Sequence, residues 1–228
     1  MQSKHRKISA VIFDIDGTLV DSLSDYYSVF NRGTGRYKLE PVSEEALFNY
    51  LRKGLSLGEI LRKIFPSHTE ESIIEACKRE IIELFLRIEV DEIKPFPGIE
   101  ELFRNLKDRG IKIGIATGRM TSSEDEWKRF GRFGVERFIE AIVTSKEVEA
   151  RKPAPDSIIE CAKRLHVSPD ECLVVGDAES DIVAARKAGA RPVAVSKRED
   201  NREWLNVSKP EFVISDIKEI PLLLDRLF

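Results

Sequence analysis

The sequence has few of the residues that build disulfide scaffolds or metal sites rich in sulfur. Three of its 228 residues are cysteines and three are histidines, and no metal-ligand spacing joins the cysteines. An odd number of widely separated cysteines argues against a disulfide framework. Each cysteine lies in an apolar run, so we expect reduced, packed thiols in a cytoplasmic protein, at Cys77, Cys161 and Cys172.

Long apolar runs and a strong net charge are also missing. The apolar run at residues 8–13 meets Asp14 and is too short for a signal-peptide core. No stretch approaches the ~20 apolar residues of a membrane span. With 37 basic and 40 acidic residues, the net charge is only −3. Bulk charge therefore gives no reason to expect a nucleic acid or an anionic membrane as a partner.

What the sequence does contain is a regular alternation of strand-like and helix-like runs. Hydrophobic residues make up 42% of the chain, which is enough for a substantial core. This alternation predicts an α/β fold, with a doubly wound parallel sheet and helices on both faces. Strands are expected at residues 8–13, 111–116, 139–144, 172–175, 192–195 and 212–214, and helices at 99–109, 124–133, 155–165, 180–188 and 217–227.

The alternation stops between residues 21 and 94, where only helical patterns occur. Helices are expected there at residues 21–30, 43–53, 55–65 and 69–90, the last with an apolar stripe at helical spacing. An all-helical insert just after the first strand is best interpreted as a small separate domain. We therefore expect a core of residues 1–20 and 95–228 and a helical domain of residues 21–94.

The first strand ends in two carboxylates, Asp14 and Asp16, followed by Gly17 and Thr18. Acid groups at this end fall where open α/β sheets bind ligands. Two carboxylates so close together repel unless a cation or a shared proton relieves them. The pair alone could also be a turn former, because Asp-Gly is a good turn dipeptide.

Polar residues follow other predicted strands as well. Thr117 and Gly118 follow the second strand, Lys152 precedes a helix, and Asp177 and Asp181 follow the strand at residues 172–175. In a parallel sheet these strand ends lie along one edge, so the residues can meet. Taken singly, Lys152 could be a solvated lysine, Asp181 a first-turn helix charge and Thr117 the N-cap of the next helix.

The chemistry of these residues is complementary. Asp14 and Asp177 offer oxygen ligands of the kind that Mg²⁺ prefers. Thr117, the Gly118 amide and Lys152 can bind phosphoryl oxygens. Asp14 can attack as a nucleophile, and Asp16 can exchange a proton with the leaving group and with water.

Four runs of the chain resemble, in order, the four motifs of the haloacid dehalogenase-like hydrolases. They are Asp-Ile-Asp-Gly-Thr at 14–18, Ala-Thr-Gly-Arg at 116–119, Arg-Lys-Pro at 151–153 and Gly-Asp-Ala-Glu-Ser-Asp at 176–181. The helical insert is similar to the α-helical cap of that superfamily. Many relatives have a hydroxyl residue where this chain has Ala178.

The resemblance implies a Rossmann-like core and a Mg²⁺-dependent phosphatase that acts on small phosphorylated metabolites. It implies that Asp14 is the nucleophile and Asp16 the acid/base, with its backbone carbonyl also on the metal. Thr117, Gly118 and Lys152 would hold the phosphoryl group. Asp177 would bind the metal, and Asp181 would support it directly, through water or through Lys152.

The resemblance also suggests where substrate specificity resides. Arg52 and Lys53, at a polar break between two helices of the insert, are similar in position to the specificity loop of phosphoglycolate-phosphatase-like members. We expect one of them to reach a substrate carboxylate. The alternative is that both only complement a helix C-terminus capped by Gly54.

Two other functions stay open from the sequence. A sugar-phosphate mutase of the β-phosphoglucomutase kind would have the same architecture and would return the phosphoryl group to a sugar. A phosphate-binding or partner-binding protein would use the scaffold without catalysis, which the acid and lysine set at residues 14, 16, 152 and 177 argues against. The sequence leaves open whether the protein is a monomer or a homodimer.

Overall fold

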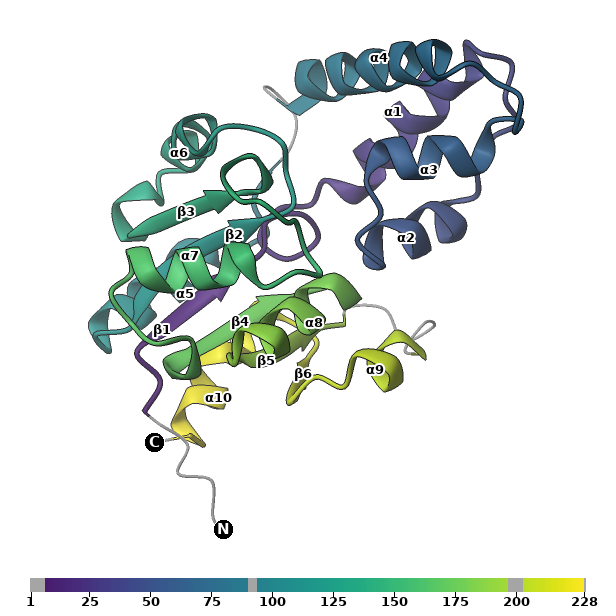
Figure 1. The fold of residues 1–228 in the computed structure, drawn as a ribbon. Helices are drawn as coiled ribbons and strands as arrows, with labels where there is room; N and C mark the ends of the chain where they lie inside the picture. Colours follow the sequence, from purple (N-terminus) through teal and green to yellow (C-terminus); the bar gives the residue numbers. More distant parts are fainter. Residues whose placement is uncertain (1–6, 90–93, 197–202, 228) are drawn as a thin grey trace. The chain divides into compact units, whose positions relative to one another are not determined.

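The computed structural model describes residues 7–89, 94–196 and 203–227. The chain divides into two compact units, one of residues 1–20 with 95–228 and one of residues 21–94 (Figure 1). Each unit is described by itself below.

Within the described residues, six parallel strands form one sheet in the first unit, in the order β3-β2-β1-β4-β5-β6. The predicted doubly wound α/β fold is therefore confirmed. This strand order places a topological switch point beside β1, which pairs with both β2 and β4. The strands are β1 (Ala10–Phe13), β2 (Lys112–Thr117), β3 (Ala141–Thr144), β4 (Cys172–Gly176), β5 (Arg191–Val195) and β6 (Phe212–Ile214).

The central strand is apolar throughout because both of its faces are covered. Ile12 belongs to a core cluster with Cys161 of α7 (Asp156–Arg164) and Ala184 of α8 (Glu179–Ala188). Its neighbour Phe13 packs against Phe103 of α5 (Ile99–Asp108), with ring centroids 5.5 Å apart and the rings tilted by 44°. Successive side chains of a strand point to opposite faces, so helices pack on both sides of the sheet. Figure 1 shows α7 and α8 in front of the strands, and α5 behind them.

The remaining elements of this unit differ in part from the prediction. The expected helix at 217–227 is a 3-10 turn, η4 (Ile217–Glu219), followed by α10 (Ile220–Asp225). A short helix that was not predicted follows β5. The elements not yet named are α6 (Ser123–Arg132), α9 (Glu203–Ser208), η1 (Glu136–Phe138), η2 (Ser145–Glu147) and η3 (Pro169–Glu171).

The second unit is helical, as expected, and has its own apolar core. Its helices are α1 (Leu23–Gly35), α2 (Glu44–Arg52), α3 (Leu57–Ile64) and α4 (Glu71–Glu89). Val90, the expected end of the last helix, lies outside the described residues. Phe30, Leu47, Leu61 and Ile81 are fully buried against one another. The unit therefore has the separate core that a small domain needs.

None of the described helices is long and apolar enough to cross a membrane. Cys77, Cys161 and Cys172 are buried and unpaired, as the sequence predicts. Burial raises the pKa of Cys77 to about 11 and that of Cys172 to about 12, so these thiols stay protonated at neutral pH. They serve as small apolar side chains.

Candidate active site

Three carboxylates meet at the carboxyl edge of the sheet, beside the switch point. Asp14 follows β1, Asp177 follows β4, and Asp181 lies in the first turn of α8. One oxygen of each lies within 4.8 Å of one oxygen of each of the others. The amide of Asp14 donates to the carbonyl of Val175 at 2.9 Å, which holds the end of β1 against β4. The sheet therefore brings together acids that are more than 160 residues apart in the sequence.

Two glycines allow this close approach. Gly17 has a φ of +76°, and a Cβ there would overlap the carboxylate of Asp177. A Cβ on Gly176 would overlap the side chain of Asp181. Thr18 donates from its hydroxyl to Oδ1 of Asp177 at 3.1 Å, which orients that carboxylate. A side chain at either glycine would therefore displace the acid that it meets.

Lys152 joins two of the carboxylates. Its ammonium donates to Oδ1 of Asp14 at 2.8 Å, to Oδ1 of Asp181 at 2.6 Å and to the carbonyl of Ala116 at 2.6 Å. An ammonium has three N–H donors, so these acceptors use all of them. The other oxygen of Asp181 accepts from the amide of Ala178 at 3.1 Å. Lys152 is thus held in one position from three sides, and only 5% of its surface is exposed.

The electrostatics of the cluster favour an added cation. Burial raises the pKa of Asp14 well above its ordinary value, and Asp181, Asp16 and Asp177 raise it further, against the lowering effect of Lys152. Although burial disfavours the charged form of Lys152, Asp14 and Asp181 raise the pKa of its ammonium, so it stays protonated. One buried ammonium thus faces several carboxylates, a surplus of negative charge that a second cation relieves.

The donor atoms of this cluster fit a hard divalent cation. Carboxylate oxygens are the ligands that Mg²⁺ and Ca²⁺ take, whereas zinc sites use mainly nitrogen and sulfur. Because both oxygens of Asp181 already accept hydrogen bonds, Asp14 and Asp177 are the better placed to offer ligand atoms.

Asp16 contacts a residue to which the sequence analysis gave no role. Arg119 donates from Nε to Oδ2 of Asp16 at 2.7 Å and from Nη2 to Oδ1 at 2.6 Å. The two residues are 103 positions apart, so neither spacing nor periodicity could have paired them. The only available signal was that Arg119 ends the Ala-Thr-Gly-Arg run.

Arg119 is itself backed by buried charges from α6. Its Nη1 lies 3.7 Å from Oε1 of Glu126, a residue with no exposed surface. Glu126 also accepts from the hydroxyl of Thr121 at 2.6 Å and from Nε of Arg129 at 2.9 Å. Charges alternate along Asp16, Arg119, Glu126 and Arg129, so each one is paired with its opposite.

Thr117 ends β2 and is 1% exposed. Its hydroxyl accepts from the amide of Arg119 at 3.3 Å. The expectation that Thr117 caps the next helix is wrong, because the N-cap of α6 is Ser122, whose hydroxyl accepts from the amide of Asp125. Five residues intervene between Thr117 and α6, and they form a loop at the edge of the sheet.

Gly118 lies beside a second residue without an assigned role. Nη2 of Arg151 is 3.9 Å from the position that a Cβ on Gly118 would take. The Nε of Arg151 is buried without a hydrogen-bond partner among the described residues. The phosphoryl-binding residues expected from the sequence therefore have another cation next to them.

Arg52 and Lys53 belong to the helical unit. Arg52 is the last residue of α2, and Lys53 is its C-cap, with its amide donating to the carbonyls of Asn49 and Leu51. Gly54 has a φ of +79° and donates to Leu51 at 2.8 Å. The helix-terminus alternative thus describes the local geometry, and contact of either residue with a substrate stays a prediction.

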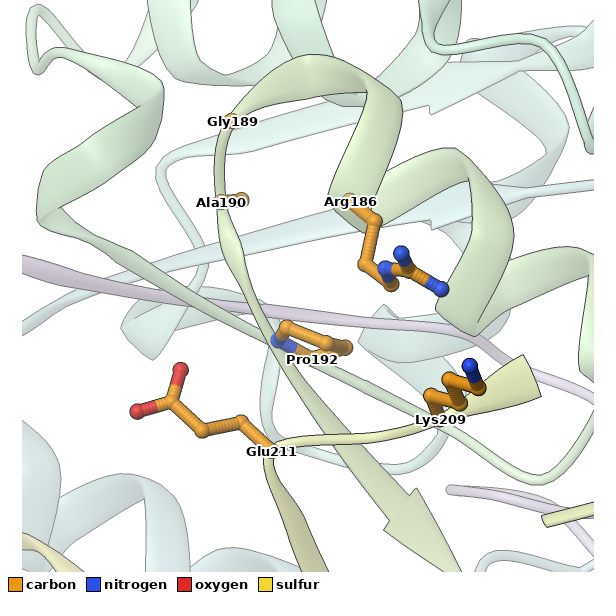
Figure 2. A pocket seen from close by; sticks show the side chains of 6 residues that line it. All are labelled: Arg186, Gly189, Ala190, Pro192, Lys209 and Glu211. Carbon is orange, nitrogen blue, oxygen red and sulfur yellow. The ribbon is translucent and has the colours of Figure 1, made fainter. Parts of the chain in front are cut away.

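A hollow in the first unit lies away from these residues. It is lined by Arg186, Gly189, Ala190, Pro192, Lys209 and Glu211 (Figure 2). Most of these residues come just before or at the start of β5 and β6, at the amino edge of the sheet. Ligands of open α/β sheets bind at the carboxyl edge. The acidic cluster, not this hollow, is therefore the candidate site.

Known proteins match most of this chain. A model of the haloacid dehalogenase-like hydrolase family matches residues 11–195. The pyrophosphatase PpaX of Bacillus mycoides is 30% identical over 222 residues, which cover 97% of this chain and 99% of that protein.

Solved structures share the fold. A protein described as a predicted phosphoglycolate phosphatase, from Haemophilus somnus, superposes with a TM-score of 0.79 at 21% identity, over 96% of this chain and 98% of that one. A β-phosphoglucomutase from Clostridium difficile does so with a TM-score of 0.74 at 24% identity, again over 96% and 98%.

Proposed function

The chain belongs to the haloacid dehalogenase-like hydrolases, and from that premise we propose that it is a Mg²⁺-dependent phosphatase. It would hydrolyse small phosphorylated metabolites through an aspartyl-phosphate on Asp14. The observation that carries this proposal is the placement of Lys152 between Asp14 and Asp181, with Asp177 in the same cluster. A nucleophile, a phosphoryl-binding cation and metal ligands are the parts that phosphoryl transfer to a carboxylate needs.

In the first half-reaction a carboxylate oxygen of Asp14 attacks phosphorus, and the bond to the leaving oxygen breaks. The ammonium of Lys152 lies against Asp14, so its charge can offset that of the phosphoryl group. One of its three N–H groups would leave its present acceptor and donate to a phosphoryl oxygen of the bound substrate. The hydroxyl of Thr117 and the amide of Gly118 would donate to the other phosphoryl oxygens. Asp16, protonated at a lone pair that Arg119 does not occupy, would give that proton to the leaving oxygen.

In the second half-reaction water attacks the aspartyl-phosphate. Asp16, now ionised, would take a proton from that water, and phosphate would leave with Asp14 restored. Asp14, Asp177 and the backbone carbonyl of Asp16 would hold Mg²⁺. The ion would neutralise charge that develops on the phosphoryl oxygens. Asp181 would hold Lys152 in place.

The helical unit of residues 21–94 would act as a cap that selects the leaving group. In that role Arg52 or Lys53 would contact a substrate carboxylate, as in 2-phosphoglycolate. The names of similar proteins offer two substrate classes, pyrophosphate for the PpaX relative and phosphoglycolate for the Haemophilus somnus structure. Both carry a second anionic group beside the reacting phosphate.

Phosphate release by the purified protein tests the proposal. Wild type and Asp14→Asn would be assayed with p-nitrophenyl phosphate, pyrophosphate and 2-phosphoglycolate, each with Mg²⁺ and with EDTA. Asp108→Asn is a matched control, because Asp108 is an exposed aspartate at the end of α5. We expect turnover that needs Mg²⁺, is kept by D108N and is lost by D14N. Wild-type activity in D14N would refute the nucleophile.

A sugar-phosphate mutase is the second candidate, because the Clostridium difficile structure with this fold is a β-phosphoglucomutase. Glucose 1-phosphate separates the two functions. A phosphatase releases inorganic phosphate from it, whereas a mutase forms glucose 6-phosphate. Isomer formation without net phosphate release would decide for the mutase.

A further inference from the structure

We propose that Arg119 is a positioning residue that holds the carboxylate of Asp16 in the orientation needed for proton transfer to the leaving oxygen. This inference rests on the proposed function, since it concerns the group that acts as acid and base there. Arg119 itself has no assigned role in the reaction above.

The geometry of the pair fixes an orientation as well as a position. Nε and Nη2 of Arg119 each donate to a different oxygen of Asp16, at 2.7 and 2.6 Å. Two parallel bonds from a planar guanidinium align the plane of the carboxylate with its own. A single hydrogen bond would leave Asp16 free to rotate about its χ2 angle.

Arg119 is more buried than Asp16, as expected for a residue that positions a proton-transfer group. The side chain of Arg119 is 7% exposed and that of Asp16 is 31% exposed. A group that exchanges protons with substrate and water must reach them, whereas the group that orients it must not move. The more accessible partner is thus fixed by the buried one.

The backbone of Arg119 is anchored on two sides. Its amide donates to the hydroxyl of Thr117 at 3.3 Å, and its carbonyl accepts from the amide of Ser145 at 3.0 Å. These contacts join Arg119 to the ends of β2 and β3, the strands at that side of the sheet. The backbone of Arg119 is therefore tied to the sheet by hydrogen bonds on both sides.

Buried charge behind Arg119 fixes the guanidinium itself. Glu126 is fully buried 3.7 Å from Nη1, and is held in turn by Thr121 and Arg129. Although burial disfavours its charge, Asp16, Glu126 and Asp14 raise the pKa of Arg119, so it stays a cation. Burying the carboxylate of Glu126 costs free energy. Its role would be to hold the guanidinium of Arg119 in place.

The inference predicts a dependence on the leaving group. Protonation of the leaving oxygen matters greatly for an alkyl phosphate and little for 2,4-dinitrophenyl phosphate, whose leaving group departs as a stable anion. We expect Arg119→Met to lower kcat about 100-fold for an alkyl phosphate that the wild type hydrolyses, which is within the range of general acid catalysis. The loss with 2,4-dinitrophenyl phosphate should be less than about tenfold, and KM should change little for both.

A double-mutant cycle with Asp16→Asn tests whether Arg119 acts through Asp16. If it does, Arg119→Met costs nothing further in the D16N background. Arg191→Met is the matched control, because Arg191 is 9% exposed and makes two hydrogen bonds, of 3.0 and 2.6 Å, to Oε1 of Glu211 at the opposite edge of the sheet. R191M should leave the ratio of the two substrates' kcat values unchanged.

Two milder variants keep the inference falsifiable if R119M does not fold. Arg119→Lys retains the charge but makes one bond to Asp16, and Glu126→Gln retains the volume behind Arg119. Both variants should also lose more kcat with the alkyl phosphate than with 2,4-dinitrophenyl phosphate, but the losses should be smaller than those of R119M. Equal losses on the two substrates, or additive losses in the cycle, would overturn the role of Arg119 while the phosphatase stands. A wild type that hydrolyses neither substrate would overturn both proposals.

Discussion

Oδ1 of Asp181 and the ammonium of Lys152 are joined by a hydrogen bond of 2.6 Å, and both side chains are at most 5% exposed. Asp181 is the more buried of the two acids that share this lysine, with 4% of its side chain exposed against 12% for Asp14. Its second oxygen accepts from the amide of Ala178 at the start of α8. The pair is thus part of the structure of the folded protein as well as of its proposed chemistry. Stability and activity should respond differently when it is changed.

Removal of Lys152 should destabilise the protein, and removal of its partner should restore stability without activity. Lys152→Met leaves Asp14 and Asp181 buried without their common cation, which should cost about 3 kcal/mol of the free energy of unfolding. In Lys152→Met/Asp181→Asn one of the two charges is gone, so most of that loss should return. Neither variant should hydrolyse phosphate esters. Urea denaturation with parallel assays measures both, and equal stability of the single and double variants would contradict this account.

Asp14 should make the metal-free protein less stable as the pH rises. Burial raises its pKa in the folded state above the ordinary value of 3.8, with further increases from neighbouring acids and a decrease from Lys152. A group with a raised folded pKa contributes stability that is complete below the unfolded pKa and is lost as the pH rises through the folded pKa. In EDTA at neutral pH, Asp14→Asn should therefore unfold at a higher urea concentration than wild type.

The comparison of D14N with wild type across pH 4 to 8 isolates this group from the others. Exposed acids such as Glu71 and Asp125 have lowered pKa values and act in the opposite sense, but they are the same in both proteins. The stability difference should be small at pH 4 and grow with pH. Mg²⁺ should stabilise wild type, by about 2.7 kcal/mol at a hundred times its Kd, and D14N much less. A constant difference across this range would contradict a raised pKa of Asp14.

The sequence predicts the sheet and the acidic cluster because both depend on local signals. Apolar runs such as residues 8–13 identify strands buried on both faces, and parallel strands bring Asp14 and Asp177 to one edge whatever the loops do. The link between Asp16 and Arg119 has no local signal. It depends on the conformation of the loop at residues 118–122. Because of this loop, the N-cap of α6 is Ser122 and not Thr117.

In the helical unit, too, the sequence predicts the fold but not the role of a particular side chain. Its helices and its separate core follow from the apolar periodicity, and in the structure Ser43 and Ser56 cap two of these helices. The side chain of Arg52 is compatible with a helix terminus and with a substrate contact alike, because a helix C-terminus and an anionic substrate both favour a nearby cation. Residue type and spacing alone do not separate these two roles.

A side chain at Gly17 should impair metal binding more than folding. Ala at this position would have a φ of +76° and a Cβ that overlaps the carboxylate of Asp177. Gly110→Ala is the matched control, since Gly110 has a φ of +71° with nothing within 4 Å of its Cβ position. Both variants should lose about 1 kcal/mol or more from backbone strain. Only G17A should need much more Mg²⁺ for half-maximal activity, and equal Mg²⁺ dependence of the two variants would count against Asp177 as a ligand.

Arg52 and Lys53 should matter only for substrates that carry a second anionic group. If either residue contacts the carboxylate of 2-phosphoglycolate, then Arg52→Ala or Lys53→Ala should lower kcat/KM for that substrate at least tenfold, equivalent to a lost charged hydrogen bond of about 1.5 kcal/mol. Activity on p-nitrophenyl phosphate, which lacks the carboxylate, should stay within twofold, a smaller change than about 0.5 kcal/mol. Lys63→Ala is the control, because Lys63 is an exposed lysine of the same helical unit and lies in the last turn of α3. If both alanine variants match K63A on both substrates, the two cations only complement the end of α2, and the source of specificity must be sought elsewhere in the helical unit or at Arg151.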